Sequence, residues 1–182
     1  MGRTERLLIL FHHRWNLPVL AELHRTSGTR FVLLLNRLGI SRDSLTHTLA
    51  ALIHARWVRR NPGYGHPLRP EYILTNSGSR IAPHCQAILD EMRRRQLEDV
   101  ALRKWSMPVL LEIAGGTEHF AGLKTAFPGI TARALSLALG DLLEISLIDR
   151  IVVDDYPPTT RYELNPIARP LARALSGLAG SL

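Results

Sequence analysis

The stretch RWNLPVL at residues 14–20 returns as KWSMPVL at residues 104–110, with the tryptophan and the proline in the same places. Trp15 and Trp105 are 90 residues apart, and this offset persists along the chain. It pairs Gly39 with Gly129, Ile40 with Ile130, Tyr72 with Tyr162 and Leu74 with Leu164. Chance alignment of apolar residues does not explain why rare Trp, Pro, Gly and Tyr residues match in order. The sequence therefore predicts two homologous domains.

Each copy has the same order of expected helices. An apolar run after the tryptophan predicts a first helix, and a short second helix carries Phe31 in one copy and Phe120 in the other. Ser41 or Thr131 then stands where a helix N-cap is expected, just before leucines at helical spacing. Each copy should therefore contain three helices in succession.

A β-hairpin is expected after the third helix. In the first copy, residues 57–60 and 72–74 indicate two strands, joined by a wide Gly- and Pro-rich loop at residues 61–67. Three helices followed by a hairpin are the order of a winged helix-turn-helix, whose third helix enters the major groove and whose hairpin is the wing. We expect a mainly α fold with small β-hairpins (α+β), built from two tandem winged helix-turn-helix domains joined by a long helix.

The segment between the copies indicates the joining helix. Residues 83–103 contain no glycine and no proline after Pro83, and they carry apolar side chains among arginines. The expected division is a first winged-helix domain at 1–82, a linker helix at 83–103 and a second winged-helix domain at 104–182. Apolar residues expected to join the domains, or two chains, lie on the linker and the final helix: Ile88, Leu89, Met92, Leu171, Leu175 and Leu178.

The charge of the chain is unevenly distributed. The formal net charge is +7, and residues 1–100 hold 15 Lys and Arg against 8 Asp and Glu, whereas residues 101–182 hold 8 of each. The whole excess belongs to the first half, and it favours a polyanionic partner such as double-stranded DNA.

The motifs resemble those of the HxlR-type winged-helix transcription regulators, relatives of the MarR group. The resemblance rests on Arg14-Trp15, Phe31, the Gly-Ile-Ser of residues 39–41 and the YILTNSG of residues 72–78. In the second copy NPIA at residues 165–168 replaces the Thr-x-x-Gly end of that motif. The resemblance implies DNA binding and homodimers of single-unit chains, a pattern from which a tandem chain departs.

The residues expected to contact DNA belong to the third helix and wing of the first copy. Arg side chains suit guanine and phosphate, and short polar side chains offer further hydrogen bonds to bases or the backbone. The set comprises Ser41, Arg42, Asp43, Ser44, Thr46, His47, Arg59, Arg60, His66 and Arg69.

The second copy is expected to read DNA poorly. Its third helix leaves one charge, Arg133, and an exposed-looking Leu137 where polar residues should read DNA. Its wing carries Asp154 and Asp155, which would repel phosphates. The alternative is weak DNA contact through Arg133, Arg150 and Arg161 alone. We interpret it as a degenerate domain used for packing or protein contact. An intramolecular pseudo-dimer of the two copies is expected, and a homodimer is the alternative.

Other classes of function find little support in the sequence. No apolar run approaches the roughly 20 residues that span a bilayer, and the first residues lack the features of a signal peptide, so a cytoplasmic location and no membrane partner are expected. The single cysteine, Cys85, forms no internal disulfide and is expected to be buried rather than redox-active. His12-His13 and His84-Cys85 lack the spacing of a helical metal pair, and we expect no metal, cofactor or enzymatic activity.

Two functions remain open. The first is a transcriptional regulator that reads duplex DNA with the third helix and basic wing of the first copy. The second is a winged-helix protein–protein interaction module with only non-specific affinity for DNA.

Overall fold

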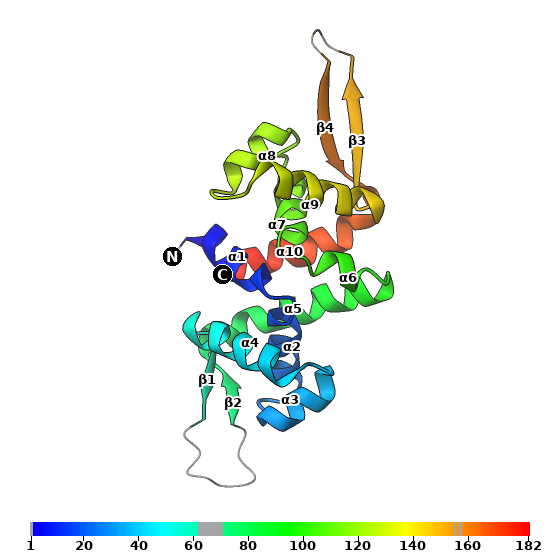
Figure 1. The fold of residues 1–182 in the computed structure, drawn as a ribbon. Coiled ribbons are helices and arrows are strands. Elements are labelled where there is room, and N and C mark those ends of the chain that lie inside the picture. Colours follow the sequence, from blue (N-terminus) through cyan, green and yellow to red (C-terminus); the bar gives the residue numbers. More distant parts are fainter. Residues whose placement is uncertain (1, 62–70, 155, 157) are drawn as a thin grey trace.

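Two winged-helix units occupy opposite ends of the molecule, and a layer of helices lies between them (Figure 1). The computed structural model describes residues 2–61, 71–154, 156 and 158–182. Head 1, as we call the first unit, consists of α2 (Asn16–Arg25), α3 (Phe31–Leu38), α4 (Arg42–His54), β1 (Val58–Arg60) and β2 (Tyr72–Leu74). Head 2 consists of α7 (Ser106–Ala114), α8 (Phe120–Ala126), α9 (Ala132–Glu144), β3 (Ile148–Val153) and β4 (Thr159–Leu164).

The central layer contains the remaining elements: α1 (Arg3–His12), α5 (Asn76–Arg94), α6 (Glu98–Ala101), the 3₁₀-helix η1 (Pro166–Ala168) and α10 (Arg169–Ser181). Each head ends in one antiparallel hairpin, with Arg59 paired to Ile73 in head 1 and Ile151 paired to Arg161 in head 2. The two hairpins extend from opposite ends of the molecule (Figure 1). The α+β fold and the two tandem units joined by a long helix are therefore confirmed.

The third helix of each head begins at the N-cap that the sequence predicted. The Ser41 hydroxyl accepts a hydrogen bond from the Ser44 amide at 3.2 Å, and the Thr131 hydroxyl accepts one from the Ala134 amide at 3.1 Å. Such caps satisfy amide donors that have no partner within the helix. Gly39 ends α3 in the left-handed region with φ +60°, which turns the chain sharply before α4.

The Thr-x-x-Gly motif fixes the start of α5 against the hairpin. The Thr75 hydroxyl accepts from the Gly78 amide at 3.0 Å and donates to the carbonyl of Arg56 at 2.6 Å. A Cβ on Gly78 would lie only 1.9 Å from the carbonyl oxygen of Trp57, so no larger residue fits there without a shift of backbone. In head 2 the corresponding segment, with Ala168 in place of the glycine, opens with the 3₁₀-helix η1 instead.

The expected bounds of the linker helix are wrong. Helix α5 begins at Asn76, continues through Pro83 and ends at Arg94, so it does not cover residues 83–103. It stops because Gln96 adopts the left-handed conformation with φ +57°, and the short α6 follows. The division of the chain into domains at 82/83 and 103/104 stays a prediction.

Helices α5 and α10 pack against each other in the central layer. All six residues expected to join the two copies are buried: Ile88, Leu89, Met92, Leu171, Leu175 and Leu178. Gly177 permits the close approach, since a Cβ there would lie 2.8 Å from Nδ1 of His84. The Ser181 hydroxyl lies 3.0 Å from the other ring nitrogen of His84, a contact between two distant helices that no local pattern predicted.

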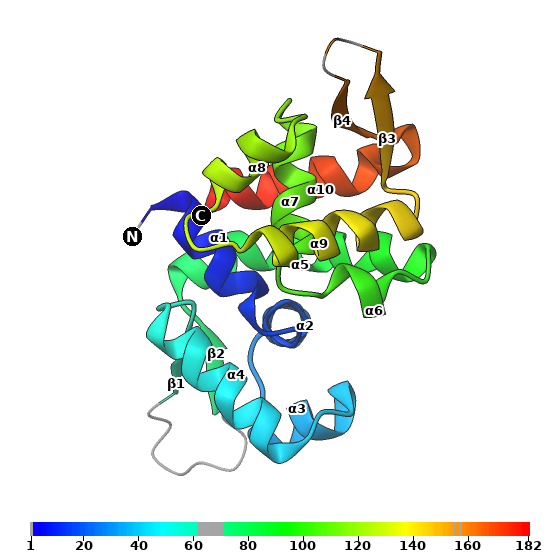
Figure 2. The ribbon, with the colours of Figure 1, turned by 45° about the horizontal axis from the view of Figure 1, so that its top comes forward.

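Helix α1 was not predicted. It buries Leu7, Leu10 and Phe11, and the Asn16 side-chain amide donates to the carbonyl of Ile9 at 2.9 Å, which joins α1 to α2. Figure 2 shows α1 between the two heads, with the C-terminal end of α10 beside it. It therefore connects the heads rather than belonging to one of them.

Candidate nucleic-acid interface

Helix α4 presents a polar face to solvent at its N-terminal end. Arg42, Asp43, Thr46 and His47 are exposed, whereas the leucines on the other face of the helix are buried in the core. Ser41 is exposed as well, but its hydroxyl serves as the N-cap and also donates to the half-buried Ser44 hydroxyl at 2.9 Å. The structure thus brings all six predicted residues of this helix together, with four of them directed outward.

Arg42 lies against an aromatic ring. Its guanidinium carbon is 5.4 Å from the centre of the Phe31 ring of α3, and the hydroxyl of Thr46 donates to the backbone carbonyl of Arg42 at 2.9 Å. A guanidinium stacked on an aromatic face keeps its donors at the edge, where they are available to a planar acceptor.

The hairpin of head 1 offers two exposed arginines, of which Arg60 is paired with a carboxylate. Arg60 donates to the Glu71 carboxylate at 2.8 Å and lies over the ring of Tyr72 at 5.6 Å. Arg59 is exposed, on the opposite side of the strand. His66 and Arg69, the other two predicted wing contacts, lie outside the described residues.

A groove of about 610 Å³ runs between α3, α4 and the hairpin. Arg42 and Arg60 line it together with Phe31 and Tyr72. The groove brings the basic residues of the helix and of the strand to one surface of head 1.

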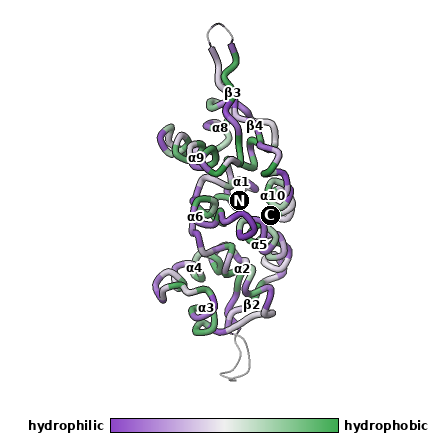
Figure 3. Tube along the Cα trace, turned by 90° about the vertical axis from the view of Figure 1, so that its right-hand side faces the viewer, coloured by the Kyte–Doolittle hydropathy of each residue, from purple (hydrophilic) through white to green (hydrophobic). Residues whose placement is uncertain are grey.

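Head 2 repeats the geometry of head 1 with different side chains. The pattern of burial along residues 131–140 is identical to that along 41–50. The exposed positions are held by Ala132, Arg133, Ser136 and Leu137, and Leu137 exposes 61% of its surface. Figure 3 shows α4 and α9 along the same side of the molecule.

The hairpin of head 2 is not basic at its end. Asp154 is exposed, while Asp155 lies outside the described residues. Arg161 in β4 is paired with Glu163 at 2.9 Å, which reduces its availability to phosphate. Exposed apolar side chains, Val152 at 65% and Tyr156 at 104%, lie near the end of the hairpin instead.

Glu22, which sequence reasoning missed, holds α3 in place. Its carboxylate accepts two hydrogen bonds from Arg25, at 2.7 and 2.9 Å, and one from Arg37 of α3 at 2.9 Å. Burial raises the pKa of Glu22, but the hydrogen bonds and charges of the two arginines together lower it by more. The pKa of Glu22 is therefore below its ordinary value. The spacing of Glu22 and Arg25 within one helix was the only signal in the sequence; the contact with Arg37 depends on the tertiary fold.

Metal, thiol and membrane chemistry receive no support from the part of the chain that the structure describes. Among those residues, no cluster of three or more His, Cys, Asp or Glu side chains is arranged to hold a metal ion. Cys85 is completely buried, and burial raises the pKa of its thiol well above the ordinary value. No described helix is long and apolar enough to cross a membrane.

The repeated order of three helices and a hairpin defines a tandem winged helix-turn-helix protein. The pattern of the HxlR-like helix-turn-helix family matches residues 10–99 and again residues 100–180. The chain therefore belongs to the HxlR-like helix-turn-helix family, in tandem duplicate as the motifs predicted. This family is one of regulators rather than enzymes, in agreement with the expectation from the sequence.

Three similar proteins each carry the name of an uncharacterized HTH-type transcriptional regulator. YtcD of Bacillus subtilis is 33% identical over 75 residues, which are 41% of this chain and 60% of YtcD. YtfH of Escherichia coli is 27% identical over 102 residues, 56% of this chain and 75% of YtfH. The protein sll1512 of Synechocystis is 32% identical over 77 residues, 42% of this chain and 57% of that protein. No solved structure matches the chain significantly.

Proposed function

We propose that this protein is a DNA-binding transcriptional regulator that reads duplex DNA with head 1 alone. The observation that carries the proposal is the contrast between α4 and α9, which have the same pattern of exposure but different exposed side chains. At the places of Arg42 and His47 in α4, α9 exposes Ala132 and Leu137, while Ser136 takes the place of Thr46 and one arginine, Arg133, replaces Asp43. Membership of a helix-turn-helix family and the names of the relatives agree with this function.

Each exposed group of head 1 has a distinct role in the proposed complex. Arg42 is placed at the N-terminal end of α4, where it donates to the O6 and N7 acceptors of guanine. Thr46 and His47 offer shorter hydrogen bonds to neighbouring bases or phosphates. Arg59 in β1 supplies a phosphate contact, which adds affinity but no sequence preference.

Head 2 serves in this proposal as the partner of head 1 within one chain. The buried apolar residues of α5 and α10 form the contact that joins them, and the tether between the heads keeps the local concentration of head 2 high. A second chain would have to displace this contact to pair through the same helices. The arrangement is a pseudo-dimer with one competent and one silent head.

A protein–protein interaction module is the second candidate. It is favoured by the exposed apolar side chains of head 2, namely Leu137 on α9, Val152 on β3 and Tyr156. In that case the basic head 1 would hold the protein near DNA without reading a sequence.

Selection of bound sequences from a random duplex pool, using the full chain, tests the proposal. A regulator should enrich one motif, and its affinity for that motif should fall linearly on a log–log plot against salt concentration, because phosphate contacts release counterions. Recovery of unbiased sequences would support the interaction module, whose apolar interface is strengthened rather than weakened by excluded salts.

A further inference from the structure

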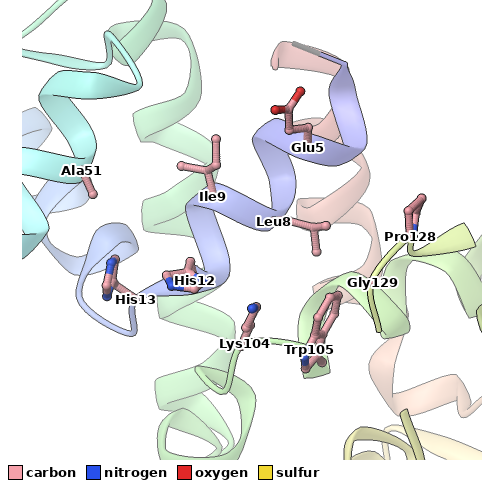
Figure 4. Close-up of a pocket in the computed structure, with 10 residues that line it drawn as sticks. All are labelled: Glu5, Leu8, Ile9, His12, His13, Ala51, Lys104, Trp105, Pro128 and Gly129. Atoms are coloured by element: carbon pink, nitrogen blue, oxygen red, sulfur yellow. The ribbon is translucent and has the colours of Figure 1, made fainter. Parts of the chain in front are cut away.

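A pocket of about 530 Å³ lies between α1, the recognition helix α4 and the start of α7 (Figure 4). Leu8 and Ile9 of α1 form an apolar wall, and Trp105 faces them from the N-cap of α7. Ala51 of α4 closes one side. The pocket therefore contacts both heads and the helix between them.

Basic groups gather at one end of this pocket. Lys104 and His12 lie near each other in Figure 4, and the His12 and His13 rings meet edge to face at 4.7 Å. The Lys104 ammonium is 4.9 Å from the centre of the Trp105 ring. Glu5 is the acidic group of the lining, and it lies about two turns of α1 away from His12.

The internal repeat supplies a natural comparison, because a second pocket of about 430 Å³ occupies the corresponding place in the other half of the molecule. Arg14 and Trp15 line it as Lys104 and Trp105 line the first, at the offset of 90 residues. The backbone before each tryptophan is also equivalent, with hydrogen bonds of 3.0 Å from the Asn16 amide and 3.3 Å from the Ser106 amide to the residue three places earlier. The two pockets are therefore counterparts.

The second pocket holds a carboxylate next to its cation, whereas the one carboxylate in the lining of the first pocket, Glu5, forms no ion pair with Lys104 among the described residues. In the second pocket Asp99 forms an ion pair with Arg14 at 3.4 Å, and Glu98 lies beside it in the lining. The offset replaces Glu98 and Asp99 by Leu8 and Ile9 in the first pocket.

The cation of the first pocket consequently has no acidic partner of this kind. Among the residues that the structure describes, Lys104 forms no ion pair within 4.0 Å. Asp141, which lines a neighbouring hollow with Lys104, is paired with Arg103. Lys104 therefore lies beside the apolar wall without an acidic partner in the described part of the chain, whereas Arg14 in the second pocket is paired with Asp99.

From this difference we propose that the pocket between α1, α4 and α7 binds a small amphipathic carboxylate with an aromatic body. The carboxylate pairs with Lys104 and the neighbouring His12, in the place that Asp99 takes beside Arg14. The aromatic body lies between the apolar wall of α1 and the Trp105 ring. A ligand bound in this pocket would contact Ala51 of α4, so the site adjoins the recognition helix of head 1.

Proton linkage gives the site a defined pH dependence. Partial burial, and then the charges of Lys104 and His13, lower the pKa of His12, so this ring is largely neutral at neutral pH in the empty pocket. A bound carboxylate favours the protonated ring and raises its pKa again. Binding therefore takes up protons, and affinity rises as the pH falls toward the range in which His12 titrates. The acidic group of the lining, Glu5, lies about two turns of α1 from His12.

Titration calorimetry of the full chain with 2-naphthoate, and with its uncharged isostere 2-naphthamide, tests the proposal. We expect saturable binding of the naphthoate and at least about tenfold weaker binding of the amide, since a charge-assisted contact is lost. The naphthoate should bind more tightly at about pH 6 than at about pH 8. Equal affinity for the acid and the amide, or no binding of the acid, would overturn the proposal.

Two substitutions separate this pocket from its counterpart. Lys104→Met, which changes an exposed side chain, should weaken naphthoate binding about tenfold. The matched change Arg14→Met in the second pocket should leave it unaltered. If both variants bind as the unmodified chain does, Lys104 is not the carboxylate-binding group.

A second pair of variants tests the effect of an internal anion in the first pocket. Ile9→Asp places a carboxylate where Asp99 lies in the counterpart, and it should abolish naphthoate binding, whereas Ile9→Asn should retain most of it. Both variants are compared only after circular dichroism shows that they fold. Equal loss in the two would show that the shape of the wall, and not its charge, determines binding. The readout is occupancy of the pocket itself, so it does not depend on whether the protein binds DNA.

Discussion

The imidazole ring of His84 in α5 lies against the bare backbone of Gly177 in α10, where a Cβ would come within 2.8 Å of Nδ1. The Ser181 hydroxyl, one turn further along α10, is 3.0 Å from Nε2 of the same ring. One ring thus fills the space between the two long helices of the central layer. Its position explains why a glycine is present in the interior of α10.

Gly177→Ala tests this contact. An alanine normally stabilises a helix interior by about 1 kcal/mol relative to glycine. Here the added methyl group must displace the His84 ring, so we expect no gain or a loss of about 1 kcal/mol in the free energy of unfolding. Urea denaturation monitored by circular dichroism measures it. Gly140→Ala in α9 is the matched control, because a Cβ there meets nothing within 4 Å, and it should be stabilising.

Glu22→Gln should destabilise head 1 in a pH-dependent way. At neutral pH the change removes a charged acceptor shared by Arg25 and Arg37, which should cost about 1–3 kcal/mol of unfolding free energy. The pKa of Glu22 in the folded chain is below the ordinary value of 4.5, so its stabilising contribution is present above that value and is lost as the pH falls through the folded pKa. The difference between the two proteins should therefore shrink in acid.

The control for Glu22 is its counterpart in head 2. Glu112 forms no ion pair within the described part of the chain, so Glu112→Gln should have little effect at any pH. Thermal unfolding of both variants across the acidic range checks the prediction. A constant deficit for Glu22→Gln, independent of pH, would contradict the charged origin of the effect.

Local patterns predicted the parts of the fold that depend on local chemistry. The caps at Ser41 and Thr131 and the leucine faces behind them follow from short-range hydrogen bonding and helical periodicity. Helix α1 escaped prediction because neither a side-chain cap at Gly2 nor a tryptophan motif of the kind that opens α2 and α7 marks its start. It packs against α2 and also against α7, a helix far away in sequence, and no local pattern reveals the second contact.

The candidate interface was predictable in its residue types but not in its pairings. Exposure of Arg42, Thr46 and His47 follows from their places between buried leucines. The ion pair between Arg60 and Glu71 could not be predicted from the sequence, because it joins the two sides of the hairpin across a long loop. The start of α5 was placed too late for a similar reason, since Thr75 caps it while bonding to Arg56 in another element.

Arg42→Ala should reduce sequence discrimination. Loss of a bidentate base contact should lower the preference for the selected duplex over a random one by about 1–3 kcal/mol. Competition binding with the two duplexes measures the ratio. Arg133→Ala, which removes an exposed arginine near the start of α9, should leave that ratio unchanged. An equal effect of both variants would show that head 2 also reads DNA.

Glu71→Gln should strengthen non-specific DNA binding. The carboxylate holds Arg60 at 2.8 Å, and its removal frees this arginine for a phosphate and removes a negative charge from the groove. The slope of log affinity against log salt should steepen by up to about one unit. Arg59→Ala should have the opposite effect, flattening the slope by about one unit. An unchanged slope for Glu71→Gln would mean that Arg60 does not approach the phosphates.

The proposed pseudo-dimer predicts an asymmetric footprint from a single chain. Two equivalent heads would protect half-sites about one helical turn, roughly 34 Å, apart. Here α5 and α10 already bury the apolar residues through which two chains would pair, and the exposed side chains of α9 offer bases little to bind. Light scattering should therefore give a particle of 20.4 kDa, and footprinting on the selected duplex should show one protected half-site. A stable dimer that protects a symmetric palindrome would refute the pseudo-dimer. In that case two copies of head 1 would supply both reading surfaces, and head 2 would serve only to hold the chains together.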